Sequence, residues 1–148
     1  MPTNMKASIW QPVSGVVGPS ADIELALSLK DALVVTMHFS LVKGLPDEDL
    51  RLQFTDALAV HWEIEGPGFN SVPQDMVKCS DPQWAMWVFP LQRVEDSELL
   101  EHFRTFYEIG SSPKLAHFLL ISMNDIVHVI ARSDVKADWI PGIGALDT

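Results

Sequence analysis

Three side chains that could do chemistry stand at alternate positions of the segment AVHWEIEGPGF, residues 59–69. His61, Glu63 and Glu65 are separated by apolar residues, so a strand would place all three on one face. An imidazole and carboxylates can bind a metal ion or act as an acid–base set. Alternate residues of a strand lie about 7 Å apart at Cα, so two neighbours could share an ion, but further ligands would have to come from another strand. The same alternation describes the solvated face of an ordinary strand that buries Trp62, which is the interpretation we favour.

His117 and His128 form a second candidate for metal binding or a pH-sensitive pair. They lie in the strand-like segments LAHFLLISM and IVHVIAR, which meet at Asn124 and Asp125. A two-residue loop at that point keeps the two imidazoles far apart. A four-residue loop, residues 122–125, makes them diagonal neighbours at about 7 Å. The sequence leaves both registers open, and we expect histidines with ordinary polar partners at the margin of a sheet.

The charge balance narrows the class of partner. The chain has 10 Lys and Arg against 20 Asp and Glu, a formal net charge of −10. No cluster of basic residues is present to displace the counterions of nucleic acid or to bind an anionic membrane, so we expect neither partner. A basic protein would be attracted instead. Five carboxylates could form an acidic face for such a protein: Asp47, Glu48 and Asp49, which follow Pro46, and Glu63 and Glu65.

Motifs for catalysis and cofactor binding are not found in the sequence. There is no phosphate-binding loop, nucleophile elbow, zinc-protease helix or paired CxxC motif, so we expect no cofactor and favour a non-enzymatic protein. A metal-dependent or small-molecule-binding enzyme that uses His61 and Glu63 remains the alternative. The single cysteine, Cys79, excludes an internal disulfide, and no signal peptide or membrane-spanning run is recognised. These features predict a cytoplasmic protein.

Alternating apolar residues predict strands in the first half of the chain. Residues 22–43 fit a hairpin in which a three-residue turn, residues 30–32, pairs Leu27 with Val35 and Leu25 with Met37. A helix from Asp22 to about Leu33 is the alternative, since the apolar residues there also fit helical spacing.

The next alternating run, residues 50–64, fits either two strands hinged near Asp56 or one strand with a bulge. Residues 66–83 contain three prolines and two glycines and predict a long loop. WAMWVFP, residues 84–90, is apolar at most positions and predicts a short central strand.

The period changes in SELLEHFRTFYEIG, residues 97–110. Its apolar residues predict a helix over about residues 97–109, with Ser97 as the N-cap and Gly110 as the stop. Two strands follow, and we expect irregular segments at about 1–20 and 137–148. The sequence therefore predicts a single α+β domain, residues 1–148. Its main feature is an antiparallel sheet of about six to eight strands with one principal helix packed on it.

Two segments on either side of that helix carry a resemblance. LRLQFTDALAVHWEIE, residues 50–65, and AHFLLISMNDIVHVIA, residues 116–131, resemble the small acidic immunity-type proteins of bacterial polymorphic-toxin systems. The resemblance implies a stoichiometric binder that blocks a toxin, and it supplies no catalytic residues. A third alternative is a self-associating β protein, such as a homodimer, because the last hairpin is apolar on both faces.

Overall fold

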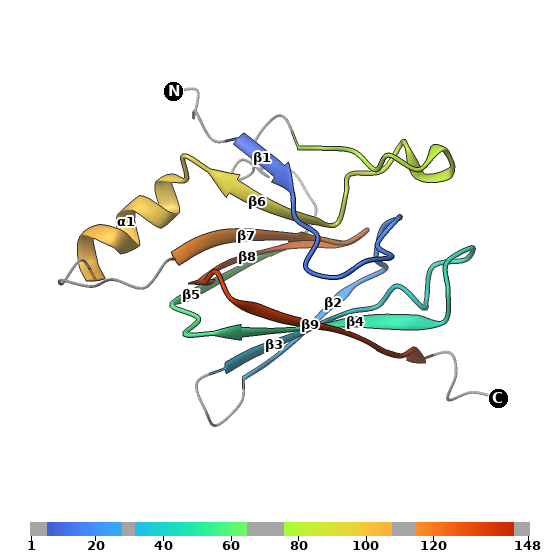
Figure 1. Cartoon of the computed structure of the whole chain (residues 1–148), viewed down its shortest axis with the longest axis horizontal. Coiled ribbons are helices and arrows are strands. Elements are labelled where there is room, and N and C mark those ends of the chain that lie inside the picture. Colours follow the sequence, from blue (N-terminus) through green and yellow to red (C-terminus); the bar gives the residue numbers. More distant parts are fainter. Residues whose placement is uncertain (1–5, 28–31, 65–75, 108–114, 144–148) are drawn as a thin grey trace.

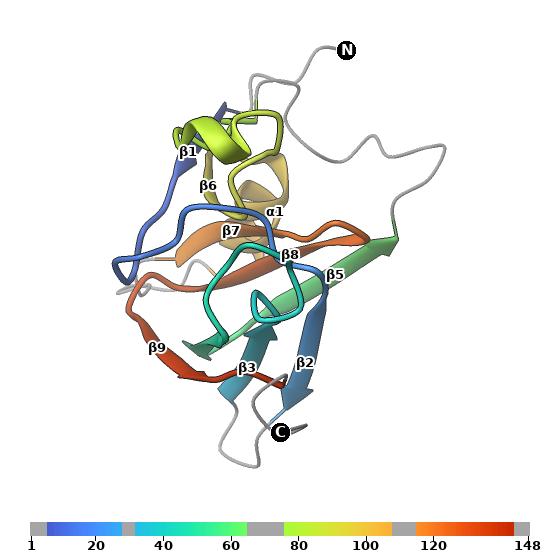
Figure 2. The ribbon, with the colours of Figure 1, turned by 90° about the vertical axis from the view of Figure 1, so that its right-hand side faces the viewer.

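In the part of the chain that the structure describes, nine strands form two antiparallel sheets that pack face to face (Figures 1 and 2). The structure is a computed structural model, and it describes residues 6–27, 32–64, 76–107 and 115–143. In order across the first sheet, the strands are β1 (Lys6–Ile9), β6 (Leu91–Glu95), β7 (Leu115–Ile121), β8 (Asp125–Arg132) and β5 (Ala59–Ile64). The second sheet contains β2 (Ile23–Leu27), β3 (Ala32–Met37), β4 (Glu48–Thr55) and β9 (Val135–Pro141).

The core lies between the two sheets and is built from alternate residues of their strands. Phe54 of β4 meets Phe118 of β7 edge to face, with ring centroids 5.2 Å apart. Trp10, just after β1, packs on both rings. Each of these contacts removes a large apolar surface from water, which is the main contribution to folding.

β2 and β3 are paired antiparallel strands, so the strand interpretation is confirmed there and the helical alternative is wrong. The register differs from the expected one: Leu27 pairs with Leu33 and Leu25 pairs with Val35. Each residue of β2 therefore pairs with a residue of β3 two positions earlier than expected, and the turn itself, residues 28–31, lies outside the described residues. An even shift keeps the apolar faces of both strands together, because side chains alternate with a period of two.

Residues 48–64 form two strands, as the first of the two alternatives predicts. The chain turns sharply at Asp56, whose φ of +50° lies in the left-handed region. The strand before this corner, β4, is an interior strand of the second sheet, and the strand after it, β5, is an edge strand of the first.

The prediction of a central strand at residues 84–90 is wrong. A 3-10 helix spans Pro82–Trp84, with the Asp81 side chain accepting a hydrogen bond from the Gln83 amide. The chain then turns, and Met86 and Trp87 are exposed. Only Val88 makes a bridge, to Lys78, and the strand begins later, at Leu91. The Trp84 and Trp87 amides donate to the carbonyls of Asp81 and Trp84, so local turns take up backbone donors that a strand would have paired.

The helix prediction is confirmed by α1 (Glu98–Tyr107), the α-helix of the described residues, which lies beside β7 (Figure 1). The Ser97 hydroxyl accepts a hydrogen bond from the Leu100 amide at 3.0 Å, the N-cap contact expected from the sequence. Gly110 lies outside the described residues. The irregular ends are shorter than expected, because residues 6–9 form β1 and residues 135–141 form β9.

The predicted fold class, α+β with mainly antiparallel sheet, is thus confirmed. No helix in the described part of the chain is long and apolar enough to cross a membrane.

Candidate functional site

His61 and Glu63 lie together on β5, as the alternation predicts. His61 Nε2 is 2.8 Å from Glu63 Oε1, and His61 is opposite His128 of β8 in the sheet register. Trp62, which we expected to be buried, is 52% exposed. Glu65 lies outside the described residues. Within the described ranges, no three His, Cys, Asp or Glu side chains are arranged to hold a metal ion.

His117 and His128 are buried inside the first sheet rather than at its margin. The four-residue loop is the one observed, with Ile121 opposite Ile126 and His128 opposite Leu119. His117 Nε2 lies 2.9 Å from His128 Nδ1, and His117 Nδ1 lies 2.6 Å from the Ser97 hydroxyl. Both ring nitrogens of His117 are therefore already engaged, which leaves it no lone pair for a metal ion.

Burial keeps these two imidazoles neutral. Desolvation, together with the neighbouring His128, lowers the pKa of His117 to about 3. Desolvation also lowers the pKa of His128 to about 4, although the negative charge of Glu63 opposes the shift. A consistent assignment has Ser97 donating to His117 and His117 donating to His128. The network therefore ties the start of α1 to the middle of the sheet, and it is a structural element at neutral pH.

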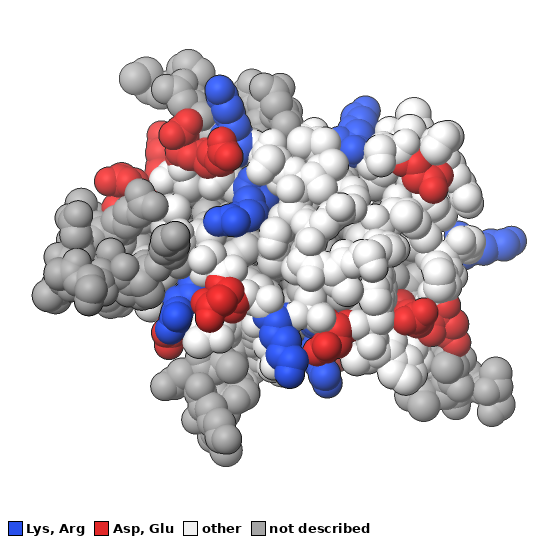
Figure 3. Space-filling model, viewed as in Figure 1, with Lys and Arg blue, Asp and Glu red and all other residues white. Residues whose placement is uncertain are grey.

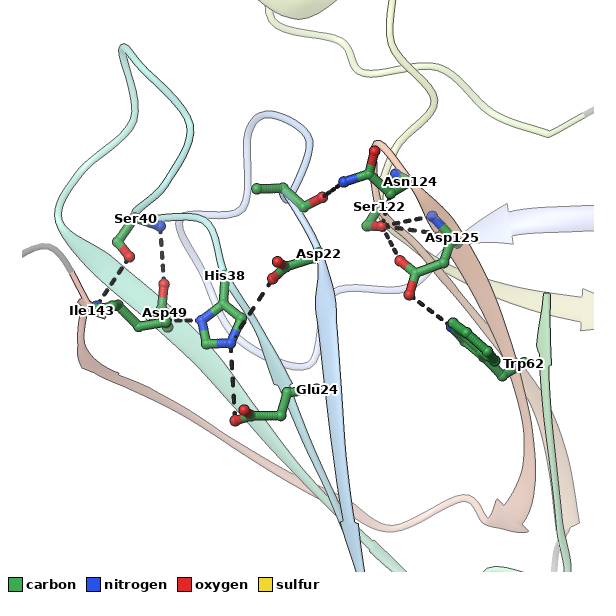
Figure 4. Close-up of polar contacts among 11 residues, drawn as sticks. Asp22, Glu24, His38, Ser40, Asp49, Trp62, Ser122, Asn124, Asp125 and Ile143 are labelled. Atoms are coloured by element: carbon green, nitrogen blue, oxygen red, sulfur yellow. Dashed lines mark hydrogen bonds and ion pairs between the residues drawn. The ribbon is translucent and has the colours of Figure 1, made fainter. Parts of the chain in front are cut away.

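A polar cluster around His38, which no sequence pattern predicted, lies on the second sheet (Figure 4). His38 follows β3 and is buried, and its Nδ1 is 2.9 Å from Asp49 Oδ2 on β4. On the other side of the ring, Nε2 faces Asp22 Oδ1 and Glu24 Oε2, each at 3.9 Å. The imidazole therefore lies between the Asp49 carboxylate of β4 and the carboxylates of Asp22 and Glu24, which lie just before and within β2.

Asp49 is internal, so its predicted place on an exposed acidic face is wrong. It is 1% exposed, and its second oxygen accepts a hydrogen bond from the Ser40 amide at 2.9 Å. Burial alone would raise the pKa of Asp49, but the hydrogen bonds from Ser40 and His38 outweigh it and hold that pKa below its usual value. Asp49 is therefore ionised and holds the His38 ring through a hydrogen bond.

The other acidic residues do not gather on one strand or one sheet. Asp47 and Glu48 are exposed at the start of β4, whereas Glu63 belongs to β5 of the first sheet. The face in Figure 3 carries Lys and Arg among the Asp and Glu residues, with a broad uncharged area between them. Excess negative charge alone therefore does not mark a binding surface there.

An apolar surface is present where the two sheets end at β2 and β5. Val60 and Trp62 of β5 pair with the core residues Val129 and Val127, so they point toward the second sheet. Leu25 and Leu27 of β2 likewise share the inner face of their sheet with the core. These side chains nevertheless remain exposed. We call this surface the open side, formed by Leu25, Leu27, Val60, Trp62 and Ile64, which are 37–82% exposed.

The loop between β7 and β8, residues 122–125, makes hydrogen bonds to the chain just before β2 and to β5. Asn124 donates a hydrogen bond to the Ala21 carbonyl, just before β2, at 3.0 Å. Asp125 accepts a hydrogen bond from Trp62 Nε1 of β5 at 2.7 Å and is also bound to the Ser122 hydroxyl (Figure 4). Figure 2 shows β2 and β5 on the same side of the molecule. Residues 122–125 therefore connect the two strands of the open side by hydrogen bonds at one end.

Within their described residues, the two edge strands of the open side lack the usual protection of edge strands. β1 carries Lys6, and β9 carries Lys136 and ends at Pro141, residues that discourage the pairing of another strand. β2 (IELAL) and β5 (AVHWEI) contain neither lysine nor proline, and their charged residues are Glu24 and Glu63. An acidic edge repels a second acidic copy of the chain and favours a basic strand.

Two small pockets lie elsewhere. One, of about 150 Å³, is lined mainly by apolar residues including Phe39, Leu45 and Trp139. The other, of about 290 Å³, lies between β8 and the segment that contains Met86 and Trp87. Neither contains the convergent polar groups that orient a small substrate.

Comparison with known proteins identifies no relative: no protein-family model, curated protein or solved structure matches this chain.

Proposed function

We propose that this chain is a non-enzymatic, cytoplasmic protein-binding protein that holds a basic partner on its open side. The observation that carries the proposal is the set of exposed apolar side chains on the inner faces of two edge strands, β2 and β5. Large exposed apolar patches are uncommon on monomeric proteins and often mark an interface. The net charge of −10 adds long-range attraction for a basic protein.

The resemblance of residues 50–65 and 116–131 to immunity-type proteins supports a specific form of this function. In that form the chain is a stoichiometric inhibitor that binds and blocks a basic toxin. The exposed tryptophan on β5 suits such a role, because aromatic residues contribute strongly to protein interfaces.

A charge-introducing variant tests the proposal. Leu27 is 82% exposed, so Leu27→Lys should leave stability within about 0.5 kcal/mol of wild type. It should weaken capture of the partner from the cells of origin by about tenfold, because it places a positive charge on the apolar contact surface. The measurement is a quantitative pull-down at low salt, followed by titration with the purified partner.

Met86→Lys is the matched control, since Met86 is also exposed (86%) but lies outside the open side. It should bind like wild type. Equal binding by the Leu27→Lys variant, or a partner that salt does not release, would contradict the proposal. The homodimer alternative is tested by measuring the molar mass of the free protein by light scattering. A strictly monomeric species would exclude that alternative.

A further inference from the structure

The free edge of β2 presents two different faces to anything that pairs with it. β2 is the terminal strand of its sheet and pairs with β3 on one side. Its inner face carries Leu25 and Leu27, and its outer face carries Glu24, next to Asp22 just before the strand. A strand added to this edge would place its own side chains alternately on the same two faces.

The outer face also contains a carboxylate oxygen that lacks a hydrogen-bond donor. Asp22 Oδ1 is shielded from solvent and makes no hydrogen bond within the described part of the chain. Its near neighbour is His38 Nε2 at 3.9 Å, which is too long for a hydrogen bond. Glu24 Oε2 stands at the same distance from Nε2, and the Glu24 side chain is 71% exposed. Figure 4 shows both carboxylates turned toward the imidazole.

His38 is already bonded on the side away from these two carboxylates. Its Nδ1 lies 2.9 Å from Asp49 Oδ2, and the Asp49 side chain is 2% exposed. A Lys or Arg side chain from outside could donate to the two carboxylates without breaking that bond. Charge-assisted bonds of this kind are stronger than neutral ones.

From this geometry we propose that the partner segment is an extended strand that adds to β2. Its apolar side chains lie beside Leu25 and Leu27, and its Lys or Arg residues, at alternate positions, reach Asp22 and Glu24. The inference rests on the proposed protein-binding function and adds to it the conformation and the sequence pattern of the bound segment. Main-chain pairing supplies affinity in this mode of recognition, and the alternate side chains supply specificity.

Two labelled peptides of identical composition test the pattern by fluorescence anisotropy. One alternates Lys and Val, and the other has all its Val residues before all its Lys residues. The alternating peptide should bind at least about tenfold more tightly, because only it can match both faces of β2 at once. Equal affinities, or no binding of either peptide, would overturn the inference.

Backbone pairing is tested with the alternating peptide itself. N-methylation of every second residue removes the donors along one edge of the peptide strand, and N-methylation of the other residues removes those along the opposite edge. One of the two methylated peptides should lose binding and the other should keep it. Equal loss or equal retention would contradict strand addition.

A double variant tests the carboxylates. D22N/E24Q changes two side chains that are at least half exposed, and it should reduce the affinity of the alternating peptide to about that of the block peptide. The control E95Q/E98Q removes the same charge from two exposed residues at the end of β6 and the start of α1, and it should bind like wild type. If both double variants weaken binding equally, the peptide responds to the net charge of the protein and not to Asp22 and Glu24, and the inference is overturned.

The two proposals can fail separately. If the Leu27→Lys substitution weakens binding of the natural partner but the peptides bind alike, strand addition is wrong and the proposed function stands. If the peptides are discriminated but the substitution leaves the natural partner unaffected, the proposed function is wrong.

Discussion

Two tryptophans on edge strands have opposite surroundings. Trp139 of β9 packs edge to face on Phe39, with ring centroids 5.6 Å apart, and lies against Gly15. Trp62 of β5 is 52% exposed. Both indole N–H groups are satisfied: Trp139 donates to the Ser14 carbonyl at 2.8 Å and Trp62 donates to Asp125 at 2.7 Å.

The difference therefore lies in what covers the rings and not in hydrogen bonding. The chain before β2 folds over β9, and Lys136 and Pro141 protect that edge. No described segment of the chain does the same for β5 or β2. A surface that folding leaves apolar and unprotected on one side, while the opposite side is covered, is the surface that we expect contact with another protein to bury.

The largest expected effect is acid destabilisation of β7 and of β8, the strand that pairs with β5, which would weaken the open side before the edge at β9. His117 and His128 have pKa values of about 3 and about 4 in the folded chain. The unfolded chain binds protons at these residues near pH 6.5, so the free energy of unfolding is unaffected by them above that pH and falls as the pH drops toward 4. At pH 5 the loss is about 2 kcal/mol for each histidine.

Urea denaturation at pH 7 and pH 5 measures this loss, and amide exchange locates it. Protection should decrease on β5 and β8 before it decreases on β9. Stability that is unchanged between pH 7 and pH 5 would show that the imidazoles are not buried as described.

The next largest effect separates the two tryptophans. Trp139→Ala should lower the free energy of unfolding by about 2–4 kcal/mol, because it removes a packed ring. Trp62→Ala should cost about 1 kcal/mol, since half of that ring is already exposed. Partner affinity should show the reverse order, with about tenfold loss for Trp62→Ala and little change for Trp139→Ala. Similar effects of both variants on both measurements would remove the distinction between the two sides.

The smallest effect concerns the protection of β9. Lys136→Val removes an exposed lysine from that edge and should produce weak, concentration-dependent self-association, with stability within about 0.5 kcal/mol of wild type. Sedimentation velocity over a range of concentrations would detect it. Leu25→Lys, which adds the corresponding charge to β2, is the complementary variant and should reduce binding at the open side. A monomeric Lys136→Val variant would show that other residues protect β9.

The strands were predicted from two kinds of pattern. β7 and β8 were located as short apolar runs, and both of their faces are buried. Alternation of apolar and polar residues located β4, β5 and the paired strands β2 and β3. It could not divide the strands between two sheets, because that division depends on the corner at Asp56 and on pairing between distant segments. The residues WAMWVFP show the limit of composition, since prolines and a capped turn decided the local structure there.

The candidate sites depended even more on register. The pairing of His117 with His128 followed from one of two loop lengths, which the sequence left open. The contact between His38 and Asp49 follows from the pairing of Met37 with Leu50, and that pairing was not predicted. If the apolar residues at 33–37 are paired with those at 50–54, the next positions, His38 and Asp49, lie opposite each other. That pairing predicts a buried Asp49, but the sequence alone does not show that these two strands are neighbours.

The loop at residues 122–125 also limits how much order a partner has to impose when it binds. Asn124 is hydrogen-bonded to the backbone just before β2, and Asp125 is hydrogen-bonded to the indole of Trp62 on β5. These two bonds connect the strands of the open side at one end before any partner arrives. Binding there therefore loses less conformational entropy than binding to two unconnected strands would.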